Sequence, residues 1–404
     1  MNSRELAIAD FTYVLPEDRI AQEPLAERDA SKLLVCRNGV ITDRTFRDVA
    51  DELPANALLV LNDTRVVNAR LVFHRSTGAR IEVLCLSPAD GAPVERAFAQ
   101  RGSATWECFV GNAKRWKEGE ELELQAGNLI LRAARSGADH VRFTWSPGEL
   151  TFADVLAQLG HVPLPPYMKR PDAEADKERY NTVFSHHAGS VAAPTASLHF
   201  TTELLRALEQ RGIRKAQLTL HVGAGTFLPV KSERMADHRM HTEQVRVPLE
   251  ALVAVREQLG KGPIVTVGTT ALRTLESVYW HGAQLLRGTA GAEISIGQWE
   301  PYEERDNEPT AQEALDAVVD SLNTRGEDRL IGTTSLLIAP GYRFRFVDGL
   351  ITNFHQPQST LLLLVAAFVG PGWRAIYDHA LAKDYRFLSY GDGSLLFRGT
   401  GMGA

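Results

Sequence analysis

The stretch "PIVTVGTTALRTLES" (263–277) decides the fold of this chain. An apolar, β-favouring run ends at a glycine and two threonines, and a segment with helical spacing follows at once. The same order, an apolar strand that ends in polar residues, recurs in "KAQLTLHVG" (215–223) and "GLITNFH" (349–355). Strands that alternate with helices predict a layered α/β domain, in which ligands bind at the carboxyl ends of the strands.

Four further segments are predicted to be helices. "TFADVLAQLG" (151–160) and "TTELLRALEQRG" (201–212) have helical spacing, and each ends at a glycine. "TAQEALDAVVDSLNTRG" (310–326) begins with a threonine and a glutamate at the spacing of a capping box. The run "TLLLLVAAFV" (360–369) is about half the ~20 residues of a membrane span, so we expect a buried helix and no membrane partner.

Residues 68–150 have a different pattern. Runs such as "ELELQAGNLILRAA" (121–134) and "DHVRFTWS" (139–146) are short, often alternate apolar with polar residues, and are separated by glycine, asparagine or aspartate. This pattern predicts a small antiparallel β barrel, and a stretch of one larger mixed sheet is the alternative. We therefore assign residues 1–67 and 151–404 to an α/β domain that is interrupted by the barrel domain.

The composition is that of a globular protein, with 44% hydrophobic and 23% charged residues in a chain of 404. The formal net charge of −6 excludes a chain-wide positive field, although a local basic patch is sufficient to bind RNA. The three cysteines are far apart and form no CxxC pair, which indicates neither a disulfide framework nor a zinc site. Because the N-terminus also lacks the apolar core of a signal peptide, we expect a cytoplasmic protein.

Five loops at strand ends and one further glycine turn carry the candidate functional residues. In "GSVAAPTASLHF" (189–200), Thr195, Ser197 and His199 precede a helix whose free N–H groups attract anions. The alternative is that the two hydroxyls satisfy local backbone groups and that the histidine is a buried, hydrogen-bonded core residue. The remaining candidates of this kind are Thr269, Thr270 and Arg273 in "GTTALRTLES" (268–277), Asn353 and His355 in "ITNFHQPQST" (351–360), and Tyr390 and Asp392 in "YRFLSYGDG" (385–393). The spacing of Arg273 and Glu276 is also that of a helical ion pair.

Two loops invite more specific interpretations. In "HVGAGTF" (221–227), His221 closes a strand, and Gly223 and Gly225 let the backbone approach a ligand, although a structural turn explains them as well. The segment lacks the ending of a P-loop. In "DHRMHTE" (237–243), two histidines three apart and a glutamate are compatible with a metal, but no cysteine or acidic cluster completes the ligand set. We expect no metal, and His241 to hydrogen-bond a substrate or to act as an acid or base.

Nine motifs follow one another along the chain: "DFTYVLPEDRIAQEP" (10–24), "LVLNDTRVVNARL" (59–71), "PLPPYMKRPD" (163–172), "GSVAAPTASLHF" (189–200), "TLHVGAGTF" (219–227), "HRMHTE" (238–243), "VGTTALRTLES" (267–277), "PGYRFRFVDGLITNFH" (340–355) and "YRFLSYGD" (385–392). In this order they closely resemble the S-adenosylmethionine:tRNA ribosyltransferase-isomerase family of queuosine biosynthesis. The resemblance covers nearly the whole chain, with an apparent insertion near 285–330, and it implies an α/β domain interrupted by a small β barrel.

The resemblance also implies a reaction. The ribosyl part of S-adenosylmethionine is transferred to 7-aminomethyl-7-deazaguanine at the wobble position of tRNA and isomerised, which gives epoxyqueuosine, adenine and methionine. S-adenosylmethionine is then a substrate, tRNA is the partner, and neither a separate cofactor nor a metal is required. We expect a monomer. The basic stretches "NAKRWK" (112–117), "MKRPD" (168–172) and "RFRF" (343–346) are candidate contacts for tRNA phosphates.

By this resemblance the site residues take roles. The candidates for acid–base catalysis or nucleobase contact are His199, His221, His241 and His355. The candidates for substrate binding are Thr195, Ser197, Gly223, Gly225, Thr269, Thr270, Arg273, Asn353, Tyr390, Asp392 and Arg65.

Three positions depart from the family pattern. Ser197 stands where the family has glycine, Gln356 where it has leucine, and Leu388 where it has phenylalanine. If position 197 requires a positive φ, the serine is strained there. The alternatives to the family reaction are a divergent paralogue that acts on another RNA or nucleoside acceptor, and a non-catalytic protein that binds tRNA or a nucleotide.

Overall fold

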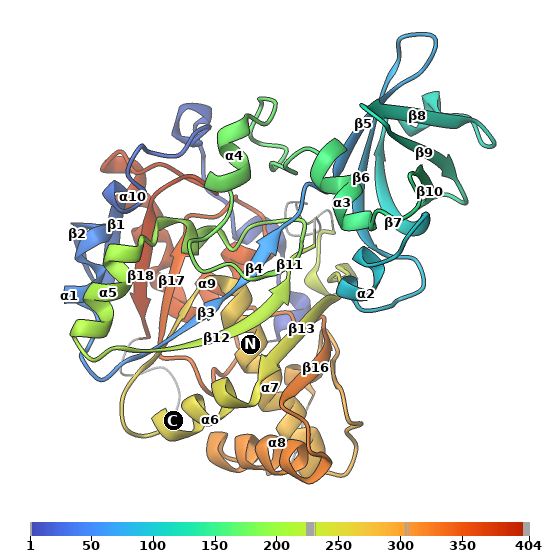
Figure 1. The fold of residues 1–404 in the computed structure, drawn as a ribbon. Coiled ribbons are helices and arrows are strands. Elements are labelled where there is room, and N and C mark those ends of the chain that lie inside the picture. The colour runs from blue at the N-terminus through green and yellow to red at the C-terminus, as the bar shows by residue number, and fades with distance from the viewer. Residues whose placement is uncertain (1, 224–229, 231, 304, 306, 399–404) are drawn as a thin grey trace.

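A computed structural model describes residues 2–223, 230, 232–303, 305 and 307–398. Its main element is a mixed sheet of ten strands (Figure 1). In sheet order the strands are β15 (Ile294–Ile296), β16 (Arg329–Thr334), β13 (Glu243–Pro248), β12 (Arg214–His221), β3 (Leu58–Asn62), β14 (Ile264–Val267), β17 (Gly349–Asn353), β18 (Gly393–Phe397), β1 (Lys32–Arg37) and β2 (Val40–Thr45).

The centre of this sheet is parallel. Strands β12, β3, β14 and β17 are parallel neighbours, whereas β13 and β18 run antiparallel on either side of them. Every residue of β3, β14 and β17 is buried, as expected for parallel strands that are covered on both faces. The predicted strands at 215–223, 263–267 and 349–355 are therefore confirmed, and their carboxyl ends lie at one edge of the sheet.

Helices cover both faces of the sheet. On one face lie α1 (Val49–Glu52) and α5 (Thr202–Gln210), and on the other lie α6 (Leu249–Gln258), α7 (Thr269–Leu286), α8 (Ala311–Arg325), α9 (Thr360–Val369) and α10 (Trp373–Ala382). Successive residues of β1 alternate between the two cores: Leu34 joins the core under α6 to α10, and Leu33 and Val35 join the core under α1 and α5. This is the layered α/β architecture that the sequence predicts.

Local capping signals set where the helices begin. The side chain of Thr310 accepts the backbone N–H of Glu313 at the start of α8, and Ser359 accepts that of Leu362 at the start of α9. Residues 360–382 together are long and apolar enough to cross a membrane. A 3₁₀ turn at Gly370–Gly372 divides them into α9 and α10, however, and half of their most apolar stretch is buried in the fold. The predicted buried helix is confirmed.

The segment near 285–330 adds β15 and α8 to the main body. The helix α8 packs directly against α7. The two backbones are so close that a Cβ at Gly282 would lie 2.0 Å from the carbonyl oxygen of Ala314. Glycine at this position therefore allows the two helix backbones to approach closely.

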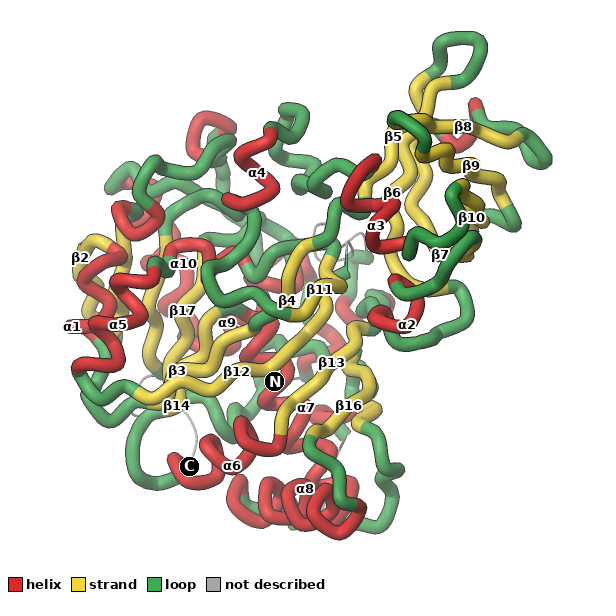
Figure 2. Tube along the Cα trace, viewed as in Figure 1, coloured by secondary structure: helices red, strands yellow, loops and turns green. Residues whose placement is uncertain are grey.

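Residues 70–146 form a separate, antiparallel sheet of six strands. In sheet order these are β5 (Arg70–His74), β6 (Arg80–Pro88), β7 (Ser103–Gly111), β10 (His140–Ser146), β9 (Leu129–Arg135) and β8 (Glu121–Ala126), and the helices α2 (Val94–Phe98) and α3 (Phe152–Leu159) accompany them. The edge strands β5 and β8 contact each other, so the sheet curves into a nearly closed barrel around Trp106, Phe143 and Phe152 (Figure 2). The alternative of one larger mixed sheet is wrong for these strands; the boundaries at 67/68 and 150/151 stay a prediction.

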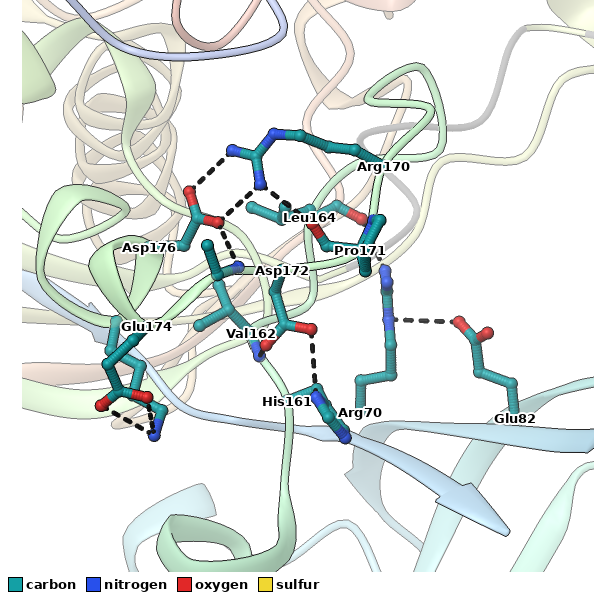
Figure 3. Close-up of polar contacts among 12 residues, drawn as sticks. Arg70, Glu82, His161, Val162, Leu164, Arg170, Pro171, Asp172, Glu174 and Asp176 are labelled. Carbon is teal, nitrogen blue, oxygen red and sulfur yellow. Dashed lines mark hydrogen bonds and ion pairs between the residues drawn. The ribbon is translucent and has the colours of Figure 1, made fainter. Parts of the chain in front are cut away.

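The chain returns from the barrel through residues 160–179, which polar contacts hold in place (Figure 3). His161 contacts Asp172 at 3.0 Å, and both terminal nitrogens of Arg170 bind the buried carboxylate of Asp176 at 2.7 and 2.8 Å. The segment ends in α4 (Glu174–Arg179). The strand β4 (Thr64–Val66), which leads into the barrel, pairs with β11 (His187–Ser190), which follows α4. Because the guanidinium of Arg170 is held by Asp176, this residue of the basic stretch at 168–172 serves the fold of the connection, and a contact of the stretch with tRNA stays a prediction.

Candidate active site

An open pocket of about 680 Å³ lies at the carboxyl edge of the parallel strands. Its wall combines residues from the ends of β12, β14 and β17 with the segment at 192–196. Of the predicted site residues, the structure brings five to this wall: Thr195, Thr269, Thr270, Asn353 and His355. The pocket is therefore assembled from loops that are far apart in the sequence, at the edge where open α/β sheets bind ligands.

A chain of hydrogen bonds connects the first of these residues to a buried histidine. The Thr195 hydroxyl donates to Asn353 Oδ1 at 2.7 Å, and Asn353 Nδ2 donates to His199 Nε2 at 3.3 Å. On the far side of the ring, His199 Nδ1 lies 2.7 Å from Ser31 Oγ, which in turn donates to the backbone carbonyl of Arg28. Since Nε2 accepts, the ring proton is on Nδ1, and the whole chain has one direction.

This chain defines what His199 can do. The ring is buried and does not line the pocket; burial lowers its pKa to about 4. A neutral imidazole at this position fixes the orientation of the Asn353 amide, so that its oxygen faces Thr195. The Thr195 hydroxyl therefore donates its proton to Asn353, and its oxygen lone pairs remain free to accept a hydrogen bond from a ligand. His199 therefore lies behind the pocket wall and contacts Asn353, and its catalytic role stays a prediction.

His355 lies on the pocket wall itself. Its Nε2 is 2.9 Å from the hydroxyl of Thr352, its backbone N–H donates to the hydroxyl of Tyr377, and Tyr13 donates to its carbonyl. Burial lowers its pKa to about 3, so the imidazole is neutral at physiological pH. A neutral imidazole that is held in this way can donate or accept a hydrogen bond to a substrate, whereas the lowered pKa makes it a weak proton acceptor.

The two threonines begin the longest helix of the fold. Gly268 has φ +89°, a conformation that glycine adopts without strain, and it turns the chain from β14 into α7 so that Thr269 and Thr270 meet the pocket. Asn62, at the end of β3, donates to the hydroxyl of Thr270 at 3.3 Å and also binds the backbone of Leu220. This asparagine therefore ties the ends of β3 and β12 to the start of α7.

The prediction of strain at Ser197 is wrong. Residues 195–199 form a 3₁₀ turn, and Ser197 has no positive φ. Its hydroxyl is buried and makes no hydrogen bond among the described residues. Leu388 has the strained backbone instead, because its φ is +68°. Both Leu388 and Gln356 line the pocket. Two of the three departures from the family pattern are thus in the pocket wall.

His221 lies beside the pocket and joins the two parts of the fold. Its Nδ1 is 3.0 Å from the hydroxyl of Thr64, and its Nε2 is 3.6 Å from a carboxylate oxygen of Glu95, which belongs to α2 of the barrel part. The hydrogen bond from His221 lowers the pKa of Glu95 to about 2. The ring lies directly over Gly189, where a Cβ would be 2.5 Å from it.

His241 and Arg273 converge on one buried carboxylate. His241 Nε2 lies 3.0 Å from Oε1 of Glu243, and Nη2 of Arg273 lies 2.8 Å from Oε2. Burial raises the pKa of Glu243, but the charges of Arg273 and His241 outweigh that effect and lower it. The predicted ion pair between Arg273 and Glu276 is wrong: the buried Glu276 accepts backbone N–H groups of residues 345–347 and the hydroxyl of Tyr342.

The other predicted residues lie elsewhere. The backbone N–H of Gly223 donates to Glu243, at the Arg273 cluster, and Gly225 lies outside the described residues. Tyr390 donates to Asp176 at 2.9 Å, and Asp392 accepts the backbone N–H groups of Lys32 and Arg386, so both stabilise the fold behind the pocket. Arg65 is exposed on β4.

Sequence reasoning missed part of the pocket wall. Thr352, Ser359 and Tyr167 line it, and the hydroxyl of Tyr167 is hydrogen-bonded to Ser389, which lines it too. Two of these missed residues had a signal in the sequence, since Thr352 precedes Asn353 at a strand end and Ser359 caps α9. Tyr167 lies in the motif at 163–172 but not at a strand end, so only the tertiary structure shows that it reaches the pocket.

Comparison with known proteins gives consistent results. A family model described as queuosine biosynthesis protein matches residues 8–396. The S-adenosylmethionine:tRNA ribosyltransferase-isomerase of Azoarcus sp. (strain BH72) is 42% identical over 97% of this chain and 98% of its own length, and that of Anaeromyxobacter sp. (strain Fw109-5) is 39% identical over 97% and 99%. The crystal structure of S-adenosylmethionine tRNA ribosyltransferase from Thermotoga maritima is 28% identical over 96% of this chain and all of that one, with a TM-score of 0.47.

Proposed function

This chain belongs to the queuosine biosynthesis protein family, and we propose that it acts as an S-adenosylmethionine:tRNA ribosyltransferase-isomerase. The observation that carries the proposal is the similarity over 97% of the chain to relatives of this name. The enzyme transfers and isomerises the ribosyl part of S-adenosylmethionine onto the 7-aminomethyl-7-deazaguanine of tRNA and releases adenine and methionine. S-adenosylmethionine is consumed as a substrate, and we propose no separate cofactor.

We assign S-adenosylmethionine to the pocket at the strand ends. The described residues of its wall carry hydroxyl, amide, aromatic and imidazole groups, and none of them is lysine, arginine, aspartate or glutamate. Because the imidazole of His355 is neutral, the pocket presents no cation that would repel the sulfonium of the substrate. Thr195, Thr269 and Thr270 offer hydroxyls suited to ribose and to the polar end of the methionine group.

His355 is the histidine that we place in contact with the substrate. The sulfonium acidifies the carbon next to it, and His355 is the neutral imidazole that lines the pocket near that carbon's proposed site, although burial makes it a weak base. His199 supports this site through Asn353 and Thr195 without contacting the substrate. We further propose a monomeric, cytoplasmic enzyme.

The test is adenine release. Purified protein is incubated with S-adenosylmethionine and with tRNA that carries the deazaguanine precursor, and adenine is quantified by chromatography. We expect adenine only with the precursor tRNA, and a loss of at least about 100-fold in turnover for His355→Ala if it transfers the proton. No adenine from correctly modified tRNA contradicts the proposal.

A divergent paralogue is the second candidate, because Leu388 and Gln356 depart from the family pattern within the pocket wall. The same assay with unmodified tRNA and with free nucleosides separates the two. Adenine release that needs one of those acceptors instead of the precursor tRNA identifies the paralogue.

A further inference from the structure

A second, smaller cavity of about 280 Å³ lies behind the wall of the active-site pocket. The two cavities share one described lining residue, Ser389, and His199 forms part of the second one while its hydrogen bond to Asn353 reaches the first. The volume of the second cavity includes open solvent at its mouth, so the cavity can be reached from outside. A ligand that enters it would therefore lie next to the active site without occupying it.

Three guanidinium groups line this cavity: Arg28, Arg179 and Arg386. Arg386 pairs with the buried Asp392 at 3.2 Å, whereas Arg28 and Arg179 have no carboxylate within ion-pair distance in the part of the chain that the structure describes. Burial and then the charge of Arg179 lower the pKa of Arg28, and the carboxylate of Glu178 raises it in part. The cavity thus has an excess of positive charge in a chain whose net charge is −6.

These arginines also hold the surrounding backbone. Arg28 donates to the carbonyls of Glu178 and Leu198, and Arg179 donates to those of Leu25 and Ala26. Carbonyl oxygens satisfy donors but neutralise no charge. In addition, Nε of Arg179 is buried and has no hydrogen-bond partner among the described residues. The backbone contacts therefore fix the guanidiniums in place and leave their charge without a neutralising ion pair at Arg28 and Arg179 among the described residues.

We propose that this arginine cavity binds a phosphodiester of the RNA substrate next to the nucleotide that reacts. The proposal rests on the function proposed above. Fixed guanidiniums are the groups that bind phosphate and carboxylate best, and a base that has left its stack brings a neighbouring phosphate with it. The carboxylate of S-adenosylmethionine shares this chemistry. It fits less well, because a small substrate in the first pocket would have to pass the wall formed by Leu198 and His199.

The experiment measures tRNA binding without turnover. The affinity of precursor tRNA is determined at several salt concentrations for the unsubstituted protein, for Arg386→Gln and for Arg28→Gln. The Michaelis constant for S-adenosylmethionine is measured in parallel. Arg206→Gln, which changes an exposed arginine on α5, is the matched control. Arg386→Gln keeps the test valid if Arg28→Gln does not fold, because Asp392 retains two backbone donors.

We expect the cavity variants to bind tRNA roughly tenfold more weakly, as the loss of a charge-assisted contact does, and to lower the slope of log affinity against log salt by about 0.7 for one contact on a single strand. Arg206→Gln should change neither. Unchanged tRNA affinity, or an increase in the Michaelis constant for S-adenosylmethionine with tRNA affinity intact, overturns the proposal; the latter result would identify the carboxylate as the anion. Because binding is read directly, failure of the unsubstituted protein to release adenine would refute the proposed function separately.

Discussion

The hydrogen bond between Thr195 and Asn353 can be tested by a double-mutant cycle. Thr195→Val removes the donor and keeps the shape, which leaves the buried Asn353 Oδ1 without its 2.7 Å partner. Asn353→Leu removes the acceptor and also leaves His199 Nε2 unpaired. The two variants and their combination separate the pair from its surroundings.

The structure gives the expected magnitudes. An unsatisfied buried acceptor costs about 1–3 kcal/mol, so Thr195→Val should lower the free energy of unfolding by about that much. Asn353→Leu leaves His199 unpaired as well and should cost roughly 2–5 kcal/mol. The penalty at His199 is present in both the single and the double variant, so it cancels in the cycle. The double variant should then be about 1 kcal/mol less destabilised than the sum of the single variants.

Urea unfolding measures all four free energies, and turnover of S-adenosylmethionine measures the consequence for the pocket. Thr195→Val combined with Ser277→Ala is the control, because Ser277 bonds to Thr334 and shares no partner with Thr195. That pair should be additive within about 0.3–0.5 kcal/mol. A coupling between Thr195 and Asn353 that is no larger than in the control refutes the directed hydrogen-bond chain.

Three further predictions concern the groups around the pocket. Because burial holds the pKa of His199 near 4 while the unfolded histidine titrates near 6.5, the unfolded state binds the extra proton, and stability falls as the pH drops from about 6.5 to 4. His199→Gln should make this part of the unfolding profile less steep, with the contribution of His355 remaining, and an unchanged profile would show that the ring of His199 is not held neutral. Gly189→Ala places a methyl against the ring of His221 and should cost roughly 1–3 kcal/mol in unfolding free energy, whereas full stability would contradict that packing. Glu243→Gln leaves Arg273 buried and unpaired, so it should cost about 3–5 kcal/mol, and a loss below about 1 kcal/mol would count against the buried ion pair.

The departures from prediction share one cause. The spacing of Arg273 and Glu276 on α7 is correct for an ion pair, yet the helix is buried on all sides and each side chain binds a different neighbour. Tyr390 and Asp392 flank Gly391 in a glycine turn of the kind that contributes to binding sites, yet neither lines the active-site pocket: Tyr390 lines the second cavity and donates to Asp176, and Asp392 accepts backbone N–H groups. In each case residues distant in the sequence supply the partner.

Short-range order is what the sequence by itself determined about this protein. The buried strands, the caps at Thr310 and Ser359, and the helix at 360–369 follow from preferences that act within a few residues, so the chain pattern is sufficient to locate them. The order of motifs was also sufficient to indicate the family.

The tertiary structure alone decided which polar groups meet. In the fold, Thr195, Asn353 and His199 form one directed chain of hydrogen bonds, and Arg273 pairs with Glu243. Three arginines, Arg28, Arg179 and Arg386, line one cavity. Hydrogen bonds and ion pairs require contact within a few ångströms, and contact between distant segments depends on how strands and helices pack. The candidate residues could therefore be named from the sequence, but their roles required the fold.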